Sequence, residues 1–492
     1  MSKNTRKKGS HMTNSITIEG IARDLSERFY DELLRTEDFF TFEHIVVTDM
    51  RVLAANVLRL CIEHFDKDIK QNLPQGWSIH ERAKRTLITL VGEVTYTRTI
   101  FLDEFRRRRA LADELLGIPP RSRMSACAFI WVARCASELS YRKCAHEFFE
   151  LSSVSISHVT VHNIVLKEGQ MLKQSGAEFI QNKAGRISQD ELFLETDGLW
   201  VHLQKSTHRD NALPRFLYEQ ARKTRSFELK IAALYAGKTK VAPGRYKRGG
   251  LCLTCMDGDA DLFWERIWQM LQENYEEEDV SRIAVGSDGA KWCMPDRLEE
   301  KVSKDCAIDY TLDLFHIMQK VAKAFPDENS KERQWADNLI MRGKGKRLLE
   351  MCKHLANKMT PGSARKKVVD LKNYIANHVR AIHAPTHELG TIEGTNAHVG
   401  AARIKGQGRS WSRAGAEAMC LIRCALMTGR DLIAPSVSSW FSEKEIAIKE
   451  ARLPHSASQI PQTTGHGWEP PQKPKVLTKN VAIPLYYRSK KA

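Results

Sequence analysis

The sequence predicts a mixed α/β protein in which a helical and β-hairpin N-terminal region precedes a sheet-containing region. Three observations predict it. Apolar residues recur at spacings of three and four near the N-terminus, short apolar runs alternate with amphipathic segments from residue 190 onward, and a basic stretch follows the last of these runs. The chain has 492 residues, of which 42% are apolar, so it is expected to be globular and to hold two to four domains.

The charge of the chain favours a polyanionic partner. Lys and Arg number 76 against 60 Asp and Glu, which leaves a net charge of +16. Such an excess promotes binding to polyanions through the release of counterions, although membrane-surface and ribosome-associated proteins share it. The sequence has no run of 18 apolar residues, so we expect no transmembrane helix and no membrane partner. The 11 cysteines are scattered and no export signal precedes them, which predicts reduced thiols in the cytoplasm.

The N-terminal region divides into two segments. Residues 1–17 are expected to form a disordered basic N-terminus, and residues 18–122 a helical and β-hairpin region that is a candidate for DNA binding. Helical periodicity runs through 18–65, and 86–102 alternates around Gly92, which predicts two strands. A proline pair marks the end of this region.

Residues 123–180 are predicted to be helical and to contain a segment with helix-turn-helix spacing. The run ELSYRKCAHEFFELSSVSISHVTVHNIVLKEG has the shape of a helix, a short polar turn and a second helix, which Ser155 or Ser157 would cap. An ordinary helical hairpin in a core fits the same spacing. If the segment recognises DNA, the contacting residues are expected in both helices: Arg142, Lys143, His158, Thr160, His162 and Asn163.

Residues 185–321 are predicted to form a mixed α/β region. Strand-like apolar runs, an amphipathic helix and further strands follow one another in this segment. The helix is 261–275, and the predicted strands are ELFLETD, LWVHLQ, 227–237, 282–290 and 306–316. Three meandering strands followed by helix, strand, helix and strand are the order of a ribonuclease H-like sheet.

Three further segments complete the predicted organisation. Residues 322–384 form a basic block with helical spacing, which predicts an all-helical insertion rich in Lys and Arg. Residues 385–430 form the next segment and include a glycine-rich stretch followed by a helical one. Residues 431–492 are rich in proline, which predicts an extended or loosely ordered tail.

Two aspartates stand at the ends of predicted strands, each directly before a glycine. Asp197 occurs in LETDGLW and Asp288 in GSDGA. Adjacent parallel strand ends would bring both carboxylates within a few ångströms. Such a pair requires a cation, and oxygen ligands favour Mg²⁺ or Mn²⁺. An Asp-Gly pair is also common in hairpin turns, so the alternative is two turns without a metal.

Other candidate positions have simpler alternatives. Cys252 and Cys255 have the spacing of a zinc knuckle, but no second pair follows, and a place in the core is favoured. Trp292 either stacks on a DNA base or covers the sheet, and covering is favoured. The glycine-rich segment 391–413 holds one acid, Glu393, among basic residues that are expected to contact DNA phosphates: Arg403, Lys405, Arg409 and Arg413.

Four stretches together carry a resemblance to a known family. ETDGLWVHLQ, GSDGAKW, DLFHIMQK and IEGTNAHVGAARIKGQGRSWSRAGAEAM resemble the ISLre-type insertion-sequence transposases. These are related to the Mutator-like transposases and were long catalogued as an uncharacterised protein family. The resemblance runs from residue 80 to residue 430, and the last stretch is its most specific part. It implies a ribonuclease H-like DDE catalytic core. Residues 185–321 would be the first part of this core, the helical insertion 322–384 would interrupt it, and residues 385–430 would complete it and supply the third acid.

The resemblance also implies a site. Asp197, Asp288 and Glu393 would be the three catalytic acids and would hold two Mg²⁺ or Mn²⁺ ions. Asp313 and His316 match the D-x₂-H motif of related transposases, and His316 would orient the site or contact the scissile phosphate. Glu388 is a rival third acid that lies outside the matching segment.

A DNA transposase is the function that these features favour. It would bind double-stranded DNA, both the terminal inverted repeats of its own element and the target, cleave by metal-dependent hydrolysis and join 3′-hydroxyl ends. Pairing of two ends implies a homodimer or a larger assembly on DNA, in the bacterial cytoplasm and associated with the nucleoid. Two alternatives stay open: a catalytically silent transposase-derived DNA-binding protein or regulator, and a structure-specific nuclease with the same fold.

Overall fold

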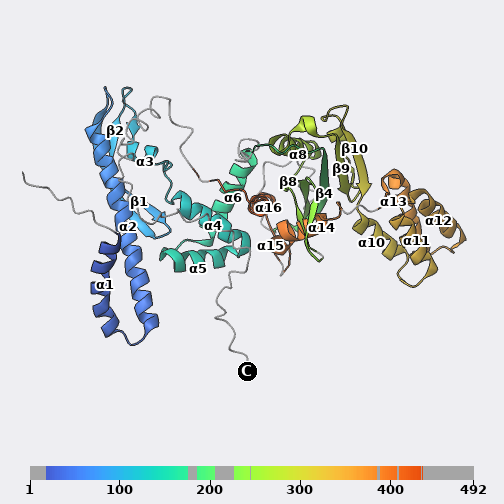
Figure 1. Cartoon of the computed structure of the whole chain (residues 1–492), viewed down its shortest axis with the longest axis horizontal. Coiled ribbons are helices and arrows are strands. Elements are labelled where there is room, and N and C mark those ends of the chain that lie inside the picture. Colours follow the sequence, from blue (N-terminus) through green and yellow to red (C-terminus); the bar gives the residue numbers. More distant parts are fainter. Residues whose placement is uncertain are drawn as a thin grey trace, which may run out of the picture. The chain divides into compact units, whose positions relative to one another are not determined.

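The computed structural model (Figure 1) describes residues 18–175, 185–204, 226–243, 245–384, 388–406, 409–433 and 435. The chain is a mixed α/β protein, as the sequence predicts. The disordered segment predicted for 1–17 and most of the tail predicted for 431–492 lie outside the described residues. Among the helices that the structure describes, none combines the length and apolar character needed to cross a lipid bilayer. The eleven cysteines are all free thiols.

Two hairpins, one helical and one of β-strands, form the N-terminal part. Their elements are α1 (Ile18–Arg35), α2 (Phe39–Gln71), β1 (Ser78–Thr89), β2 (Gly92–Leu102), β3 (Arg108–Arg109) and α3 (Leu111–Leu115). The Asp38 carboxylate caps α2 by accepting the Thr41 N–H. The buried Asp66 carboxylate of α2 accepts the N–H and the hydroxyl of Thr99 in β2, both at 2.8 Å. These bonds tie one face of α2 to the β-hairpin.

Three helices follow, and two of them form the predicted helix pair. They are α4 (Ala126–Glu138), α5 (Tyr141–Ser152) and α6 (His158–Gln174). The Ser157 hydroxyl accepts the Thr160 N–H at 3.0 Å and caps α6, as the sequence predicts. Helix α6 packs so closely on α16 (Arg413–Met427) that a Cβ added at Gly169 would lie 2.2 Å from the Cβ of Ala418.

Five strands lie side by side in the central sheet (Figure 1): β4 (Glu191–His202), β5 (Ser226–Tyr235), β8 (Cys252–Asp257), β9 (Arg282–Ser287) and β10 (Ala307–Leu312). Their order is β10-β9-β4-β5-β8. β4, β5 and β8 are antiparallel, whereas β9 and β10 run parallel to β4. Apolar side chains of one face pack on α8 (Ala260–Asn274), and those of the other face pack on α4, α6 and α16.

Two sequence predictions for this sheet are wrong. Asp197 and Gly198 do not separate two strands but lie within β4. A Cβ added at Gly198 would lie 2.0 Å from a carboxylate oxygen of Glu228, so the glycine allows close cross-strand packing instead of a turn. The second wrong prediction concerns the third antiparallel strand. This strand is β8, which is not among the predicted strands and which holds Cys252 and Cys255. Both cysteines are buried and belong to the clusters on opposite faces of the sheet, which confirms their place in the core and excludes a shared metal.

Helices occupy the segment 322–384 that is predicted as an all-helical insertion. They are α10 (Leu314–Ala324), α11 (Lys331–Met341), α12 (Gly345–Lys358) and α13 (Ser363–His378), and they enclose an apolar core of their own. The chain returns to the sheet through α14 (Ile392–Asn396), the π-helical turn η4 (Ala397–Ala401) and α15 (Ala402–Ile404). The shorter elements are β6 (Lys238–Ala242), β7 (Arg245–Arg248), α9 (Asp296–Glu299) and the 3₁₀ turns η1 (Glu277–Asp279), η2 (Lys291–Cys293) and η3 (Val379–Ala381).

Glu168 in α6 makes the stability of this fold depend on pH. Its side chain is buried, and one carboxylate oxygen accepts the Ile433 N–H at 2.8 Å, whereas the other has no partner among the described residues. Burial raises the pKa of Glu168 to about 7. Because the unfolded carboxyl loses its proton near its ordinary pKa of 4.5, the folded state loses stability as pH rises from that value through about 7.

Glu168→Gln is expected to remove this pH dependence. The difference between the folded and unfolded pKa corresponds to about 3 kcal/mol, which the wild type loses between pH 4.5 and pH 8 and the variant does not. Urea denaturation at pH 5 and pH 8 measures both free energies of unfolding. Equal changes with pH in the two proteins would contradict the prediction.

Candidate metal centre

Three aspartates follow one rung of the parallel strands. Thr196 of β4 pairs with Ser287 of β9, and Ser287 pairs with Leu312 of β10. The next residue along each chain segment is an acid: Asp197, Asp288 and Asp313. Since the carboxyl ends of parallel strands meet at one edge of a sheet, this rung brings the backbones of all three acids together.

Asp197, His316 and Glu393 form the candidate metal centre. One ligand atom from each side chain lies within 4.8 Å of the other two. Asp197 on β4 is 5% exposed, whereas the side chain of Glu393 in α14 is 44% exposed. The centre is therefore enclosed on the sheet side and accessible beside Glu393. The rival acid Glu388 lies outside it, and its carboxylate accepts the Lys238 N–H at 2.7 Å.

A hydrogen bond to Asp313 orients the His316 imidazole. Nδ1 lies 2.9 Å from Asp313 Oδ2, and Nε2 lies 3.6 Å from Glu393 Oε1. Asp313 also caps α10 by accepting the Phe315 N–H at 3.1 Å. A carboxylate behind one imidazole nitrogen is the usual support of a metal-binding histidine, because it directs the other nitrogen toward the ligand site. The bond to Asp313 also raises the pKa of His316.

The surroundings of Asp197 carry an excess of negative charge. Burial raises the pKa of Asp197 to about 7, and the Asp288 and Glu393 carboxylates add to the rise. The Gly198 N–H, which donates to Asp197 Oδ1 at 2.7 Å, and the His316 imidazole act in the opposite direction. A divalent cation would relieve this repulsion, and carboxylate ligands suit Mg²⁺ and Mn²⁺. The side chains present therefore fit such an ion.

Glu195 holds the helix that carries Glu393. Its carboxylate is 1% exposed and lies at the start of α14. It accepts three backbone N–H groups at 2.8 to 3.2 Å, those of Gly390, Thr391 and Ile392. It also accepts the hydroxyls of Tyr235, at 2.6 Å, and of Thr391. The position of Glu393 therefore depends on a buried carboxylate two residues before Asp197.

The amide of Asn396 donates to Asp197 Oδ2. Sequence patterns identified neither Asn396 nor Glu195 as part of the site. Their spacing from the predicted acids could have indicated both residues. Glu195 lies two residues before Asp197 and so shares a face of β4 with it, and Asn396 follows Glu393 by nearly one helical turn.

Asp288 is not one of the three side chains whose ligand atoms lie within 4.8 Å of one another. Its Oδ1 accepts the Ala290 N–H at 2.8 Å and the Cys293 thiol at 3.4 Å. Helix α13 holds the same loop, because the Tyr374 hydroxyl donates to the Asp288 carbonyl at 2.8 Å and His378 Nε2 lies 2.8 Å from the next carbonyl. These contacts fix the loop that carries Asp288, and the charge of its carboxylate contributes to the raised pKa of Asp197.

Two of the four residues predicted to contact phosphates are buried. Arg403 is 6% exposed, and its guanidinium is enclosed by two carbonyls and two aromatic rings, those of Ala136, Leu139, Tyr141 and Trp411. Arg413 is 9% exposed and forms a salt bridge with Asp257. A phosphate cannot reach a guanidinium that protein groups enclose, so both residues stabilise the fold instead.

Lys405 and Arg409 are more accessible. Lys405 is exposed, whereas Arg409 is half-buried and donates to the Arg403 carbonyl at 2.9 Å. Trp292 packs edge-on against Phe263 of α8 with ring centroids 5.5 Å apart and lies against the apolar cluster on that face of the sheet, so it covers the sheet. Among these candidates, Lys405 is the most exposed.

The helix pair presents four of its six candidate residues to solvent: Arg142, Lys143, His158 and Asn163. The other two have protein partners. The Thr160 hydroxyl lies 3.0 Å from the Ser157 hydroxyl, and the His162 ring packs on Tyr141 with centroids 5.7 Å apart.

Arg403→Ala and Lys405→Ala are expected to change different properties. Arg403→Ala leaves two carbonyls without their donor and lowers the free energy of unfolding by about 3 kcal/mol. Lys405→Ala leaves stability within about 0.5 kcal/mol and reduces the salt dependence of DNA binding by roughly one charge. Urea denaturation and salt-dependent DNA binding separate the two effects. A stable Arg403→Ala variant with weakened DNA binding would restore the phosphate-contact interpretation.

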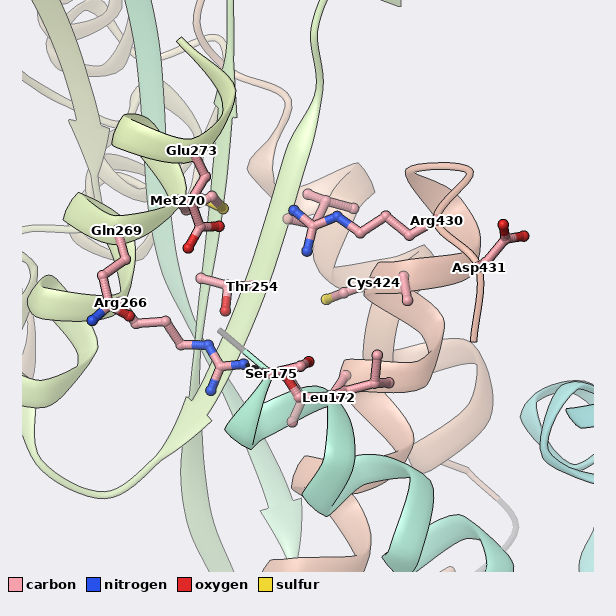
Figure 2. A pocket seen from close by; sticks show the side chains of 13 residues that line it. Leu172, Ser175, Thr254, Arg266, Gln269, Met270, Glu273, Cys424, Arg430 and Asp431 are labelled. Carbon is pink, nitrogen blue, oxygen red and sulfur yellow. Dashed lines mark hydrogen bonds between the residues drawn. The ribbon is translucent and has the colours of Figure 1, made fainter. Parts of the chain in front are cut away.

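A separate cavity lies between α6, α8, β8 and α16. Figure 2 shows the side chains that line it, among them Thr254, Arg266, Glu273 and Arg430. Burial raises the pKa of Glu273 to about 6, and the guanidinium groups of Arg430 and Arg266 oppose that rise. None of the lining residues belongs to the candidate metal centre, so this cavity adds nothing to its chemistry.

Comparisons with known proteins identify relatives along most of the chain. A family model described as "Uncharacterised protein family (UPF0236)" matches residues 35–439. The UPF0236 protein in vanSb 3′ region of Streptococcus gallolyticus is 24% identical over 407 residues, which cover 81% of this chain and 85% of the relative. A UPF0236 protein of Caldanaerobacter subterraneus subsp. tengcongensis, whose name joins eleven TTE labels, is 25% identical over 391 residues, with coverage of 77% and 76%. A further one from that organism, with four labels, is also 25% identical over 391 residues.

Proposed function

The chain belongs to the UPF0236 family, and from the acid–histidine centre on its sheet we propose that it is a DNA transposase of an insertion sequence. It would bind the terminal inverted repeats of its element, cleave DNA in a metal-dependent reaction and transfer the 3′-hydroxyl ends to target DNA. The observation that carries this proposal is the convergence of Asp197, His316 and Glu393 from three separate parts of the sequence.

The strand order supports a ribonuclease H-like DDE catalytic domain. The first strand, β4, is central and carries Asp197, and two antiparallel strands follow it on one side. Two parallel strands lie on the other side, each followed by an aspartate. Helices α11, α12 and α13 lie in the sequence between the last strand and α14. A helical insertion is expected at this place from the resemblance to the ISLre-type transposases.

Side chains of this chain would hold two Mg²⁺ or Mn²⁺ ions. Asp197, Glu393 and His316 are the proposed ligands of one ion, and Asp288 joins Asp197 in holding the other. When bound, the ions supply an activated water or 3′-hydroxyl and stabilise the leaving oxygen of the phosphodiester. Asp313 keeps the imidazole pointed into the centre, and the accessible side next to Glu393 admits the DNA strand.

Double-stranded DNA is the proposed partner. The net charge of +16 favours it, and the exposed residues of the α5–α6 pair make that pair the proposed contact to the terminal repeats. The names of two relatives each join several labels, which fits a gene carried in several copies, as insertion sequences are. The protein would act on the bacterial nucleoid, as a homodimer or a larger assembly that pairs two ends.

A cleavage and joining assay tests the proposal. Purified protein with Mg²⁺ and a duplex that contains the repeats flanking its gene should release 3′-hydroxyl ends and join them to a plasmid. Undiminished cleavage in the presence of a chelator would refute the metal-dependent mechanism. Binding without cleavage in either Mg²⁺ or Mn²⁺ would identify a silent transposase-derived DNA-binding protein, and cleavage without joining would identify a structure-specific nuclease.

A further inference from the structure

The α1–α2 hairpin exposes a large apolar surface. Of the 26 large apolar side chains that are exposed in the described part of the chain, 13 lie in these two helices and nine of those in α2. With about half of roughly 180 Å² exposed per side chain, the nine present on the order of 800 Å². Monomeric proteins rarely expose so many large apolar side chains in one patch of a few hundred Å² or more, so the hairpin is a candidate interface.

On the exposed face of α2, the intervals between successive residues are the same when they are counted from the middle of the helix toward either end. Eight positions of this face, of which Ala54 is half-buried, are Glu43, Val47, Met50, Leu53, Ala54, Val57, Leu60 and His64. The intervals between them are 4, 3, 3, 1, 3, 3 and 4, so each position has a counterpart at equal distance from the midpoint between residues 53 and 54. Intervals of three and four keep these side chains on one helix face. The five large apolar residues among them are 37% to 49% exposed.

This symmetry is what a two-fold axis requires. In an isologous interface each contact occurs twice, with the two residues exchanged between the copies. Two antiparallel α2 helices that cross at the midpoint would satisfy this condition, because every position then faces its counterpart. The opposite face of α2 is already used, since Asp66 and Ile69 are buried toward the β-hairpin.

We propose that α2 is a dimerisation helix that packs antiparallel against α2 of a second copy of this chain. Val47 then meets the partner's Leu60, and Met50 meets the partner's Val57. Glu43 lies opposite the partner's His64, so the ends of the contact hold no pair of like charges. The five large apolar residues of this face contribute on the order of 400 Å² per copy, about half of what one partner buries in a standard protein interface.

A second copy fits this face better than DNA does. The face is apolar along its centre and offers no row of Lys or Arg for phosphates. The dimer forms in free protein and uses no residue of the metal centre, so its test is independent of the proposed nuclease chemistry. The competing occupant is the segment 437–492 of the same chain.

Charge substitutions test the contact. The wild type is expected to have twice the chain mass in analytical ultracentrifugation at micromolar concentration. Met50→Glu places a carboxylate against the partner's Val57 in both halves of the interface and should raise the dimer dissociation constant at least about a hundred-fold. Adding Val57→Lys supplies the opposite charge at the facing position and should restore the dimer. Trp335→Glu is the matched control, because Trp335 is 54% exposed in α11, and it should leave the dimer intact.

Disulfide cross-linking tests the register. In a Cys61→Ser background, Val47→Cys combined with Leu60→Cys should form an intermolecular disulfide on mild oxidation. Either substitution alone should not, because identical positions in the two copies are 13 residues apart, about 20 Å along the helix. A wild type that stays monomeric would overturn the proposal, as would a dimer that Met50→Glu leaves unchanged. A monomer that dimerises only after removal of residues 437–492 would also overturn it and would identify that segment as the cover.

Discussion

Asp197→Ala is expected to reduce metal-dependent DNA cleavage by at least about a thousand-fold, equivalent to about 4 kcal/mol of transition-state stabilisation. Asp197 is the buried acid of the centre and the proposed ligand of both ions. The variant is expected to fold, because burial raises the pKa of this carboxyl to about 7 and its charged form therefore costs folding free energy. Single-turnover cleavage measures the loss, and urea denaturation verifies the fold.

Glu388→Ala is the matched control for this loss. Glu388 is an acid of the same segment as Glu393, but its carboxylate serves the Lys238 N–H and lies outside the centre. Cleavage by this variant should stay within about threefold of the wild type. An inactive Glu388→Ala with an active Asp197→Ala would place the ions elsewhere in the protein. Asp288→Ala should lose activity like Asp197→Ala if Asp288 holds the second ion.

The meeting of the strand ends could be predicted from sequence because it depends on short local patterns. A short apolar run predicts each parallel strand, and the polar residue that follows the run lies at the carboxyl end of that strand. That reasoning predicted Asp197 and Asp288; Asp288 does follow the last residue of β9, whereas Asp197 lies within β4. The place of Glu393 came from the resemblance of its segment to a family and not from periodicity.

The rest of the centre depends on tertiary contacts that no local pattern contains. Arg403 lies in a basic segment and looks like a phosphate ligand, but two carbonyls from α4 and its C-terminal cap and two aromatic rings enclose it. Gly198 looks like part of a turn, but its missing side chain leaves room for Glu228 on the next strand. Asp288 ends a strand as predicted, but one of its carboxylate oxygens accepts the Ala290 N–H and the Cys293 thiol of its own loop.

Glu195→Ala is expected to lower the free energy of unfolding by about 4 kcal/mol and to abolish cleavage as well. The substitution leaves the N–H groups of Gly390, Thr391 and Ile392 without their acceptor in a buried place, and each such group costs about 1 to 3 kcal/mol. Because these bonds hold the start of α14, their loss also frees Glu393 from its position beside Asp197. Urea denaturation and the cleavage assay measure the two consequences.

Glu393→Ala separates these consequences. The Glu393 side chain is 44% exposed, so its removal should change the free energy of unfolding by less than about 0.5 kcal/mol while cleavage is lost. Glu195→Gln keeps one acceptor oxygen and should fall between the wild type and Glu195→Ala in both stability and cleavage. If Glu195→Ala were as stable as the wild type, the bonds to α14 would not position Glu393. If it were unstable yet fully active in the folded fraction, Glu195 would stabilise the sheet without placing the third acid, and the geometry of the centre would need another support.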